Sequence, residues 1–207
     1  MNGEFTVSVV DDDPSLLKAV SRLLRTAGFM VVTFETPEEF LGSYAPSRAG
    51  CLLLDLTMPG MSGLDLQQRL REKGGAPPIV FLSGTGEIPD CVRAMRQGAV
   101  DFLTKPVDDA LLLTTIQTAV EQERSARHTR LEVADIHSRL RNLTPREREV
   151  LEHVVTGQLN KQIAVDLGTV EKTIKVHRAR AMEKMGAGSL AALVRMVLRV
   201  GIGPDLT

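Results

Sequence analysis

Reactive side chains follow four separate apolar segments within the first 120 residues of this sequence. In chain order they are Asp11, Asp12, Asp13, Asp55, Ser83 and Lys105. If the apolar segments are parallel strands, their carboxyl ends meet at one edge of a sheet, where ligands bind in open α/β folds. We therefore expect these acids, the hydroxyl and the lysine to form one site.

The chemistry expected of such a site is phosphoryl transfer. Asp55 is a carboxylate that can act as a nucleophile and form an acyl phosphate. Oxygen ligands suit Mg²⁺ (or Mn²⁺), which is usually held by few carboxylates and keeps other positions for water and a phosphate. We expect Asp12, Asp55 and the backbone carbonyl of Thr57 to bind this ion. The metal would neutralise charge on the incoming phosphoryl group.

Two further groups complete the expected site. Lys105 supplies a compact positive charge for phosphoryl oxygens, and the Ser83 hydroxyl can donate a hydrogen bond to another oxygen. Each feature alone has an ordinary explanation, because an acidic run after a strand often caps a helix and a single lysine is usually only solvated. Their convergence from four segments is what indicates a function.

The elements that would position these groups alternate along the chain. Strand-like apolar runs occupy Phe5–Val10, Met30–Phe34, Cys51–Leu54, Pro78–Leu82 and Val100–Thr104. Amphipathic, helix-like stretches occupy Ser15–Ala27, Thr36–Tyr44, Ser62–Lys73, Glu87–Gln97 and Asp108–Val120. Apolar strands separated by helices predict a parallel sheet covered on both faces. The fold class predicted for this part is α/β, a (βα)5 flavodoxin-like, doubly wound domain.

Four short stretches of this part resemble the receiver domains of two-component response regulators. They are Val10–Asp13, Leu54–Gly63, Leu82–Gly84 and Lys105–Pro106. The resemblance covers residues 5–120. It implies that Asp55 is a phosphoryl acceptor served by a cognate sensor histidine kinase, and that Asp11 and Asp12 form an acid pair in which Asp12 binds the metal directly.

The same resemblance implies a switch pair, Ser83 and Phe102, and a phosphate-sensing role for Lys105, which precedes a commonly cis peptide bond at Pro106. The sequence departs from the family in two places. Phe102 lacks a tyrosine hydroxyl, so any switch movement there must be steric. Val107 stands where phenylalanine is common.

The remaining residues are predicted to be helical throughout. Residues 121–142 contain neither Gly nor Pro and are heavily charged, which favours continuation of the preceding helix, either as a solvated linker or as a dimerising coiled coil. Thr144 and Pro145 then mark a helix start, and further helices are expected at 160–167, at 171–185 and after Ser189. Two short helices joined through a glycine turn predict a helix-turn-helix. The predicted organisation is therefore a domain at 1–122, a helical linker at 123–142 and a second, smaller all-α domain at 143–207.

This second domain resembles the LuxR-type DNA-binding modules. The matching stretches are Leu143–Leu151, Asn160–Ala164 and Thr173–Arg178. Together with the receiver, the chain most resembles the FixJ branch of the NarL/FixJ regulators. The resemblance implies a transcriptional regulator, by analogy an activator, that binds double-stranded DNA. We expect phosphorylation to promote a homodimer, although release of a masked DNA-binding domain is an open alternative.

Helical periodicity assigns the two sides of the third helix of this domain. Ile174, Ala181 and Met185 should face inward, and Lys175 and Val176 should face the major groove, reaching guanine and a thymine methyl. The residues expected to contact DNA are Asn160, Lys161, Lys172, Thr173, Lys175, Val176, Arg178, Ala179 and Arg180.

We expect more specific roles for three residues of this helix. Arg180 lies on a flank that suits a phosphate. Arg178 lies nearer the buried side and should reach a phosphate or pair with an acid. His177 should be packed structurally.

Charge and composition agree with this division. The net charge of −1 hides a charge of −5 over residues 1–120 and +4 over residues 121–207, which suits a cation in one half and a polyanion in the other. Cys51 and Cys91 provide neither a disulfide framework nor a metal-ligand spacing. No apolar run approaches the ~18 residues of a membrane span, and acids occur too early for a signal peptide. We expect a cytoplasmic protein with no membrane partner.

Three other functions are weighed against this interpretation. An aspartyl-phosphate hydrolase needs a second carboxylate two residues after its nucleophile, where this chain has Thr57, so we expect no enzyme. A receiver coupled to protein or RNA binding is disfavoured by the helix that carries Lys175. Nucleotide binding would rest only on Gly84 and Gly86, without a P-loop lysine motif.

Overall fold

The computed structural model describes residues 5–45, 49–84 and 88–201. The chain forms two compact units, the first ending at Arg127 and the second beginning at His128. Each unit has its own hydrophobic core and is described by itself below. Gly86 and Glu87, which the sequence analysis placed after the fourth strand, lie outside the described residues.

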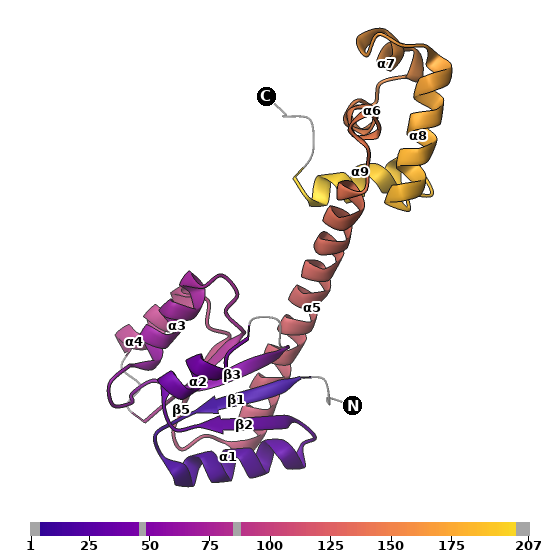
Figure 1. Ribbon diagram of the computed structural model, residues 1–207. Coiled ribbons are helices and arrows are strands. Elements are labelled where there is room, and N and C mark those ends of the chain that lie inside the picture. The colour runs from indigo at the N-terminus through magenta and orange to yellow at the C-terminus, as the bar shows by residue number, and fades with distance from the viewer. Residues whose placement is uncertain (1–4, 46–48, 85–87, 202–207) are drawn as a thin grey trace. The chain divides into compact units, whose positions relative to one another are not determined.

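The first unit is built on a five-stranded parallel sheet with the strand order β2-β1-β3-β4-β5 (Figure 1). The strands are β1 (Thr6–Val10), β2 (Met30–Phe34), β3 (Gly50–Asp55), β4 (Ile79–Ser83) and β5 (Asp101–Thr104). The helices are α1 (Pro14–Thr26), α2 (Pro37–Ser43), α3 (Gly63–Glu72), α4 (Ile88–Arg96) and α5 (Asp109–Arg141). The predicted doubly wound α/β fold is confirmed.

Helices cover both faces of this sheet because its strands are apolar on both sides. Along β3, Cys51 and Leu53 pack with α1 and α5, whereas Leu52 and Leu54 pack with α2, α3 and α4. Successive side chains of a strand point to opposite faces, so one continuous apolar run serves both cores. Asp55 is the last residue of β3, and Ser83 is the last residue of β4, instead of following the strands as the sequence had suggested.

The start of α3 lies directly against the end of β3. Ser62 caps this helix by accepting a hydrogen bond from the backbone of Asp65, whose side chain in turn accepts one from the backbone of Ser62. Such a reciprocal arrangement satisfies two otherwise unpaired helix donors. A Cβ on Gly63 would overlap the backbone oxygen of Asp55. Glycine at this position therefore allows α3 to begin beside Asp55.

The fifth helix extends well beyond the first unit. It continues without a break from Asp109 to Arg141, which confirms the predicted continuation through the charged segment. In its last turns Ile136 and Leu140 are buried in the core of the second unit. The domain boundaries predicted at 122 and 142 both fall inside or next to this helix and stay predictions.

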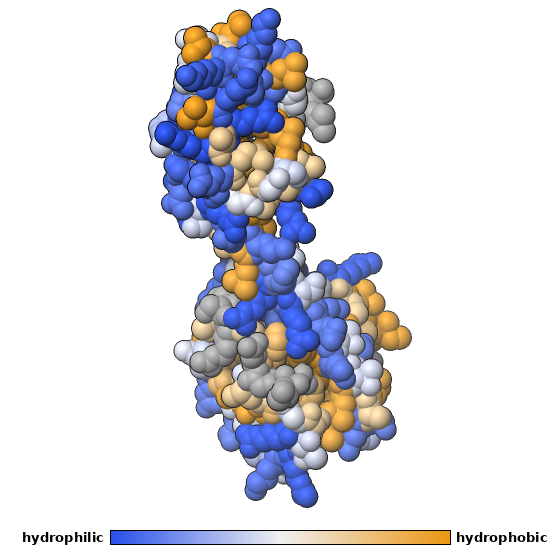
Figure 2. Space-filling model, turned by 90° about the vertical axis from the view of Figure 1, so that its right-hand side faces the viewer, coloured by the Kyte–Doolittle hydropathy of each residue, from blue (hydrophilic) through white to orange (hydrophobic). Residues whose placement is uncertain are grey.

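The second unit also contains four shorter helices. They are α6 (Pro145–Val155), α7 (Asn160–Asp166), α8 (Glu171–Met185) and α9 (Leu190–Arg199). The predicted caps are present at Thr144, which forms a reciprocal pair with Glu147, and at Ser189. The α8 helix ends at Gly186, whose φ of 64° is a left-handed conformation that favours glycine. On the face seen in Figure 2 this unit is largely hydrophilic, with isolated hydrophobic residues.

None of the helices in the described parts of the chain is long and apolar enough to cross a membrane.

Candidate functional site

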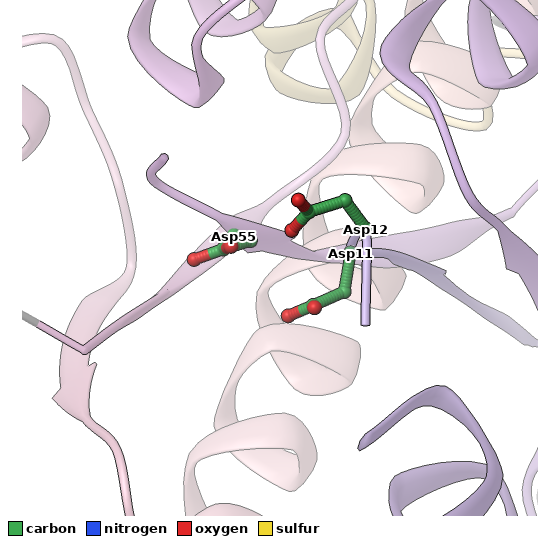
Figure 3. A group of neighbouring side chains, drawn as sticks. All are labelled: Asp11, Asp12 and Asp55. Carbon is green, nitrogen blue, oxygen red and sulfur yellow. The ribbon is translucent and has the colours of Figure 1, made fainter. Parts of the chain in front are cut away.

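Three carboxylates meet at the carboxyl edge of the sheet, as expected. Asp11 and Asp12 follow β1, and Asp55 ends β3; a carboxylate oxygen from each lies within 4.8 Å of the others. Figure 3 shows the side chains of Asp11 and Asp12 extending toward the side of the site where Asp55 lies. Asp11 and Asp55 are 1% and 5% exposed, whereas Asp12 is exposed to solvent. The site therefore has two buried acids and one accessible acid.

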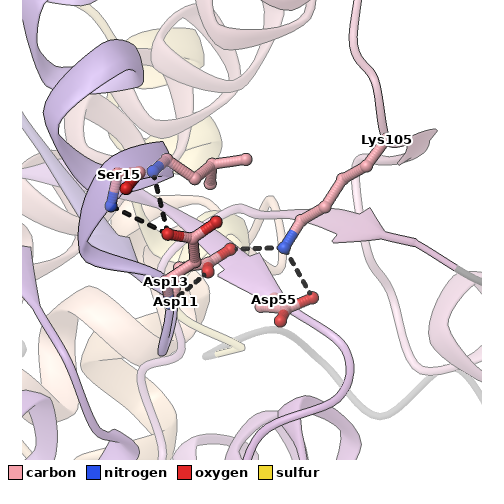
Figure 4. Close-up of polar contacts among 6 residues, drawn as sticks. Asp11, Asp13, Ser15, Asp55 and Lys105 are labelled. Carbon is pink, nitrogen blue, oxygen red and sulfur yellow. Dashed lines mark hydrogen bonds and ion pairs between the residues drawn. The ribbon is translucent and has the colours of Figure 1, made fainter.

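Lys105 bridges the two buried acids (Figure 4). Its Nζ lies 2.6 Å from Oδ2 of Asp11 and 3.3 Å from Oδ1 of Asp55. The loop after β5 is positioned by a backbone hydrogen bond of 2.7 Å from the amide of Lys105 to the carbonyl of Ser83. The peptide bond between Lys105 and Pro106 is cis, as the resemblance implies. Segments almost a hundred residues apart thus form one group of charges.

The cluster of Lys105 and the three carboxylates carries more negative than positive charge. Burial raises the pKa of the Asp55 carboxyl, and the negative charge of Asp11 raises it further, although Lys105 counteracts both. Burial acts against the charge on Lys105, but its hydrogen bond and charge interaction with Asp11, supported by Asp55, outweigh this and raise the pKa of the ammonium. One ammonium faces three carboxylates, so a further cation would be stabilised here.

The donor set at this edge fits a hard divalent cation. All three candidates offer carboxylate oxygens, the ligand type that Mg²⁺ takes in proteins, and the exposed Asp12 gives access from solvent. Asp13 differs from its two neighbours, because its Oδ1 accepts a hydrogen bond of 2.8 Å from the Ser15 amide and caps α1. The acidic run is therefore divided between a candidate metal site and a helix cap.

The remaining residues predicted for this site lie on β4, on β5 and in the segment that follows β3. Ser83 is fully buried at the end of β4. Thr57 is exposed, and its backbone amide donates a hydrogen bond to Asp55; binding of a metal by its carbonyl stays a prediction. Phe102 is partly buried on β5 and packs against Phe81, with 6.3 Å between the ring centroids. The role of Ser83 and Phe102 as a switch pair also stays a prediction.

The second unit presents the predicted helix α8 with the expected sides. Ile174, Ala181 and Met185 are buried, which confirms the inward face. The residues on α8 that were expected to face DNA and are exposed are Lys172, Lys175, Val176, Ala179 and Arg180. Thr173 is half-buried, and Lys161 is exposed on α7. DNA contact by these residues stays a prediction.

Arg178 has a partner that the sequence analysis did not foresee. It was expected to reach a phosphate or an acid, but its Nη1 donates a hydrogen bond of 2.9 Å to Oδ1 of Asn160. The amide at the start of α7 is thus one partner of this guanidinium, and contact of Arg178 with a phosphate stays a prediction. His177 is half-buried, in agreement with structural packing.

Three contacts in this unit involve residues missed by the sequence analysis. Glu171 and Lys175 form an ion pair of 2.9 Å on α8, which their i,i+4 spacing could have indicated. Lys184 donates a hydrogen bond of 2.6 Å to the buried Glu147 of α6. Arg139 of α5 donates one of 2.7 Å to the carbonyl of Met185, at the end of α8. No local pattern indicates the last two, because the partners are 37 and 46 residues apart.

Two sequence families match this chain. The family described as "Response regulator receiver domain" matches residues 7–117. The family described as "Bacterial regulatory proteins, luxR family" matches residues 141–197. The first match covers the unit that holds Asp55 and Lys105, and the second includes α6, α7 and α8.

Relatives of known name match over nearly the whole length. Nodulation protein W of Bradyrhizobium diazoefficiens is 44% identical over 97% of this chain and 88% of its own length. Transcriptional regulatory protein FixJ of Rhizobium meliloti is 41% identical over 98% of this chain and 99% of its own length. The solved structure of response regulator StyR is 43% identical, covers 95% of this chain and 100% of its own, and has a TM-score of 0.88.

Proposed function

The chain belongs to the two-component response regulators that join a receiver domain to a LuxR-type DNA-binding domain, and we propose that phosphorylation of Asp55 controls its binding to promoter DNA. Membership of this family makes it a transcription regulator and implies a histidine kinase and DNA as partners. The observation that carries the assignment of Asp55 is its contact with Lys105 beside Asp11 and Asp12.

The acceptor step follows from the position of Asp55. An oxygen of its carboxylate attacks the phosphorus of the donor and forms a P–O bond, while the bond from phosphorus to the leaving group breaks and the electron pair departs with that group. Lys105 lies within reach of both buried acids, so its ammonium can move onto a phosphoryl oxygen. Ser83, at the end of the neighbouring strand, can donate a hydrogen bond to another.

A divalent cation completes this proposal. Mg²⁺ or Mn²⁺ would be held by Asp12, Asp55 and the Thr57 carbonyl, with Asp11 as the second acid of the pair. When bound, the ion supplies positive charge to the transferring phosphoryl group. The protein's own contribution is to hold three carboxylates close together, which costs free energy that a cation recovers.

DNA binding is assigned to α8, with α7 as its support. The exposed side of α8 carries Lys172, Lys175 and Arg180 opposite the buried side. A recognition helix of this kind enters the major groove of DNA, while the preceding helix lies across the DNA backbone. Lys161 at the start of α7 suits a phosphate, because the helix N-terminus attracts anions.

Dimerisation is the proposed link between the two events. Ile88, Val92 and Met95 on α4 are 77%, 41% and 43% exposed. Movement of Ser83 and Phe102 would alter the neighbouring strands, and a symmetric pair formed through α4 would bring two DNA-binding units onto adjacent half-sites. Release of a masked α8 is the alternative mechanism.

One experiment tests the acceptor. Incubation with acetyl phosphate and Mg²⁺ should add one phosphoryl group to the native chain and none to Asp55→Asn, as measured by intact mass. Asp109→Asn makes the same chemical change on the exposed start of α5 and should be labelled like the native chain. Full labelling of Asp55→Asn would show that another residue is the acceptor.

A second measurement separates the two mechanisms. Sedimentation of the full chain with beryllofluoride and Mg²⁺ should show a shift from monomer to dimer. An active form that binds DNA and remains monomeric would exclude dimerisation and support release.

A further inference from the structure

An ion pair lies on the helix proposed to read DNA, and the role given to it here rests on that proposed function. Oε1 of Glu171 lies 2.9 Å from Nζ of Lys175, one helical turn along α8. Their side chains are 45% and 62% exposed, so both are accessible to DNA. We propose that Glu171 is a positioning residue that directs the Lys175 ammonium to a base edge and keeps it from the phosphate backbone.

The location of the pair supports this role. Glu171 is the first residue of α8, and Lys175 is in its second turn. In helix-turn-helix docking, the N-terminal residues of the recognition helix approach the base edges. The pair is thus placed where sequence is read, while Ile174 between them anchors the helix in the core.

The properties of lysine explain why it needs such a partner. Its charge sits at the end of a flexible four-carbon chain, and an unrestrained ammonium near DNA is drawn to phosphates, which gives affinity without sequence information. The carboxylate of Glu171 repels phosphate and cancels the charge of Lys175 at long range. It repels guanine O6 and N7 much less, because these acceptors carry only partial negative charge.

The ammonium can serve both partners at once. It carries three donors, so Lys175 can keep its bond to Glu171 while donating to a guanine. The expected consequence of the pair is weaker binding to random DNA and sharper discrimination at one base pair. Glu171 therefore acts through Lys175 and needs no base contact of its own.

The test compares the native full chain with Glu171→Gln on a library of randomised DNA duplexes, both proteins being activated with beryllofluoride and Mg²⁺. Glu171→Gln should bind random duplexes more tightly, by roughly 3- to 10-fold at low salt, because the freed ammonium displaces about one more counterion. The slope of log affinity against log salt should steepen by about one unit. Selected sequences should lose their preference at one base pair.

Two further variants make the result specific. Glu183→Gln removes the same charge near the other end of α8 and should leave the selected sequence unchanged. In a Lys175→Ala background, Glu171→Gln should have no further effect on base preference. A remaining effect there would show direct base contact by Glu171 and overturn the positioning role.

The outcomes also separate this inference from the proposed function. An acid in the first turn, such as Glu171, also stabilises a helix through the macrodipole. If that is its only role, Glu171→Gln will lower the melting temperature slightly. It will then select the same DNA sequence as the native chain, with the same slope of log affinity against log salt. That result overturns the inference alone. If the native chain selects no sequence, DNA recognition by α8 fails and the inference fails with it.

Discussion

Arg178 donates a hydrogen bond from Nη1 to Oδ1 of Asn160, across 2.9 Å, and thereby joins α8 to the first residue of α7. Both residues were assigned to DNA contact on sequence grounds, but each has a structural partner in the other. A change at either residue should therefore affect stability as well as DNA binding.

A double-mutant cycle tests that coupling. Arg178→Ala and Asn160→Ala should each lower the free energy of unfolding of the second unit by about 1 kcal/mol, because each removes the same hydrogen bond. Their effects in urea denaturation should not add, and the double variant should fall short of the sum by ~0.5–1.5 kcal/mol. Strict additivity would indicate that the bond contributes nothing.

Neighbouring acids of the first unit should behave differently on truncation. Asp12→Ala should weaken Mg²⁺ binding and keep or slightly raise the free energy of unfolding, since Asp12 is an exposed candidate ligand beside two other carboxylates. Asp13→Ala should do the reverse and cost ~1 kcal/mol, because Asp13 caps α1. Metal titration and urea denaturation of both variants distinguish the roles. Equal Mg²⁺ affinity in the native chain and Asp12→Ala would refute the ligand assignment.

Two basic residues of α8 should differ in what they contribute to DNA binding. Lys175→Ala should reduce specific affinity by ~1–3 kcal/mol and blur the preference at one base position. Arg180→Ala should weaken all sequences alike and reduce the salt slope by about one unit. Titration of specific and random duplexes at several salt concentrations measures both. The same sequence-independent loss in the two variants would mean that the groove-facing side is misassigned.

The buried Glu147 predicts an acid-sensitive second unit. Its hydrogen bond from Lys184, helped by the backbone amide of Thr144, lowers the pKa of the carboxyl from 4.5 to about 2. Because the folded-state pKa lies below the unfolded value, the stabilisation is complete above about pH 4.5 and is lost as the pH falls toward 2. Unfolding of this unit should become easier over that interval by on the order of 1–3 kcal/mol.

Glu147→Gln is the control for this pH dependence. It keeps a side chain that can cap α6 but removes the titrating group, so its denaturation midpoint should vary less between about pH 5 and pH 3. The native chain and this variant should differ most at neutral pH. Parallel pH profiles would assign the acid sensitivity to other carboxylates.

The end of α5 should be required for a stable second unit. A fragment of residues 128–207 retains Ile136 and Leu140, which are buried against this unit, whereas 143–207 lacks both. Loss of one such buried side chain typically costs ~2–5 kcal/mol, so the shorter fragment should be far less stable or unfolded. Thermal unfolding by circular dichroism compares the two. Equal melting temperatures would show that these residues contribute little.

The sequence predicted the first unit well because its signals are local. Each strand is a short apolar run, and each helix begins at a capping residue or ends near a glycine, so the observed bounds differ from the predicted ones by one or two residues at most ends. The sequence predicts that the acids and Lys105 lie close together, because the carboxyl ends of parallel strands lie at one edge of the sheet. Which acids are metal candidates and which one caps α1 depends on side-chain directions that the sequence does not show.

The second unit was harder to predict in its contacts than in its helices. The inward face of α8 follows from periodicity, but the partner of Arg178 depends on how α7 crosses α8. In the charged segment 121–142, polar residues predominate, and the apolar Ile136 and Leu140 do not by themselves indicate that this segment contributes to a hydrophobic core. Long-range contacts of this kind leave no periodic signal along the chain.

The burial of Ile136 and Leu140 also constrains how genes for such proteins can recombine. The helix-turn-helix resemblance begins at Leu143. A crossover just before this residue would produce a hybrid protein in which the end of α5 comes from one parent and the rest of the second unit from the other. Only parents with matching apolar residues at these two places would produce a folded hybrid. A crossover near residue 128 would transfer Ile136, Leu140 and the Arg139 bond to Met185 together. Inheritance of this DNA-binding unit should therefore follow the last turns of α5, and exchange of input domains should leave them in place.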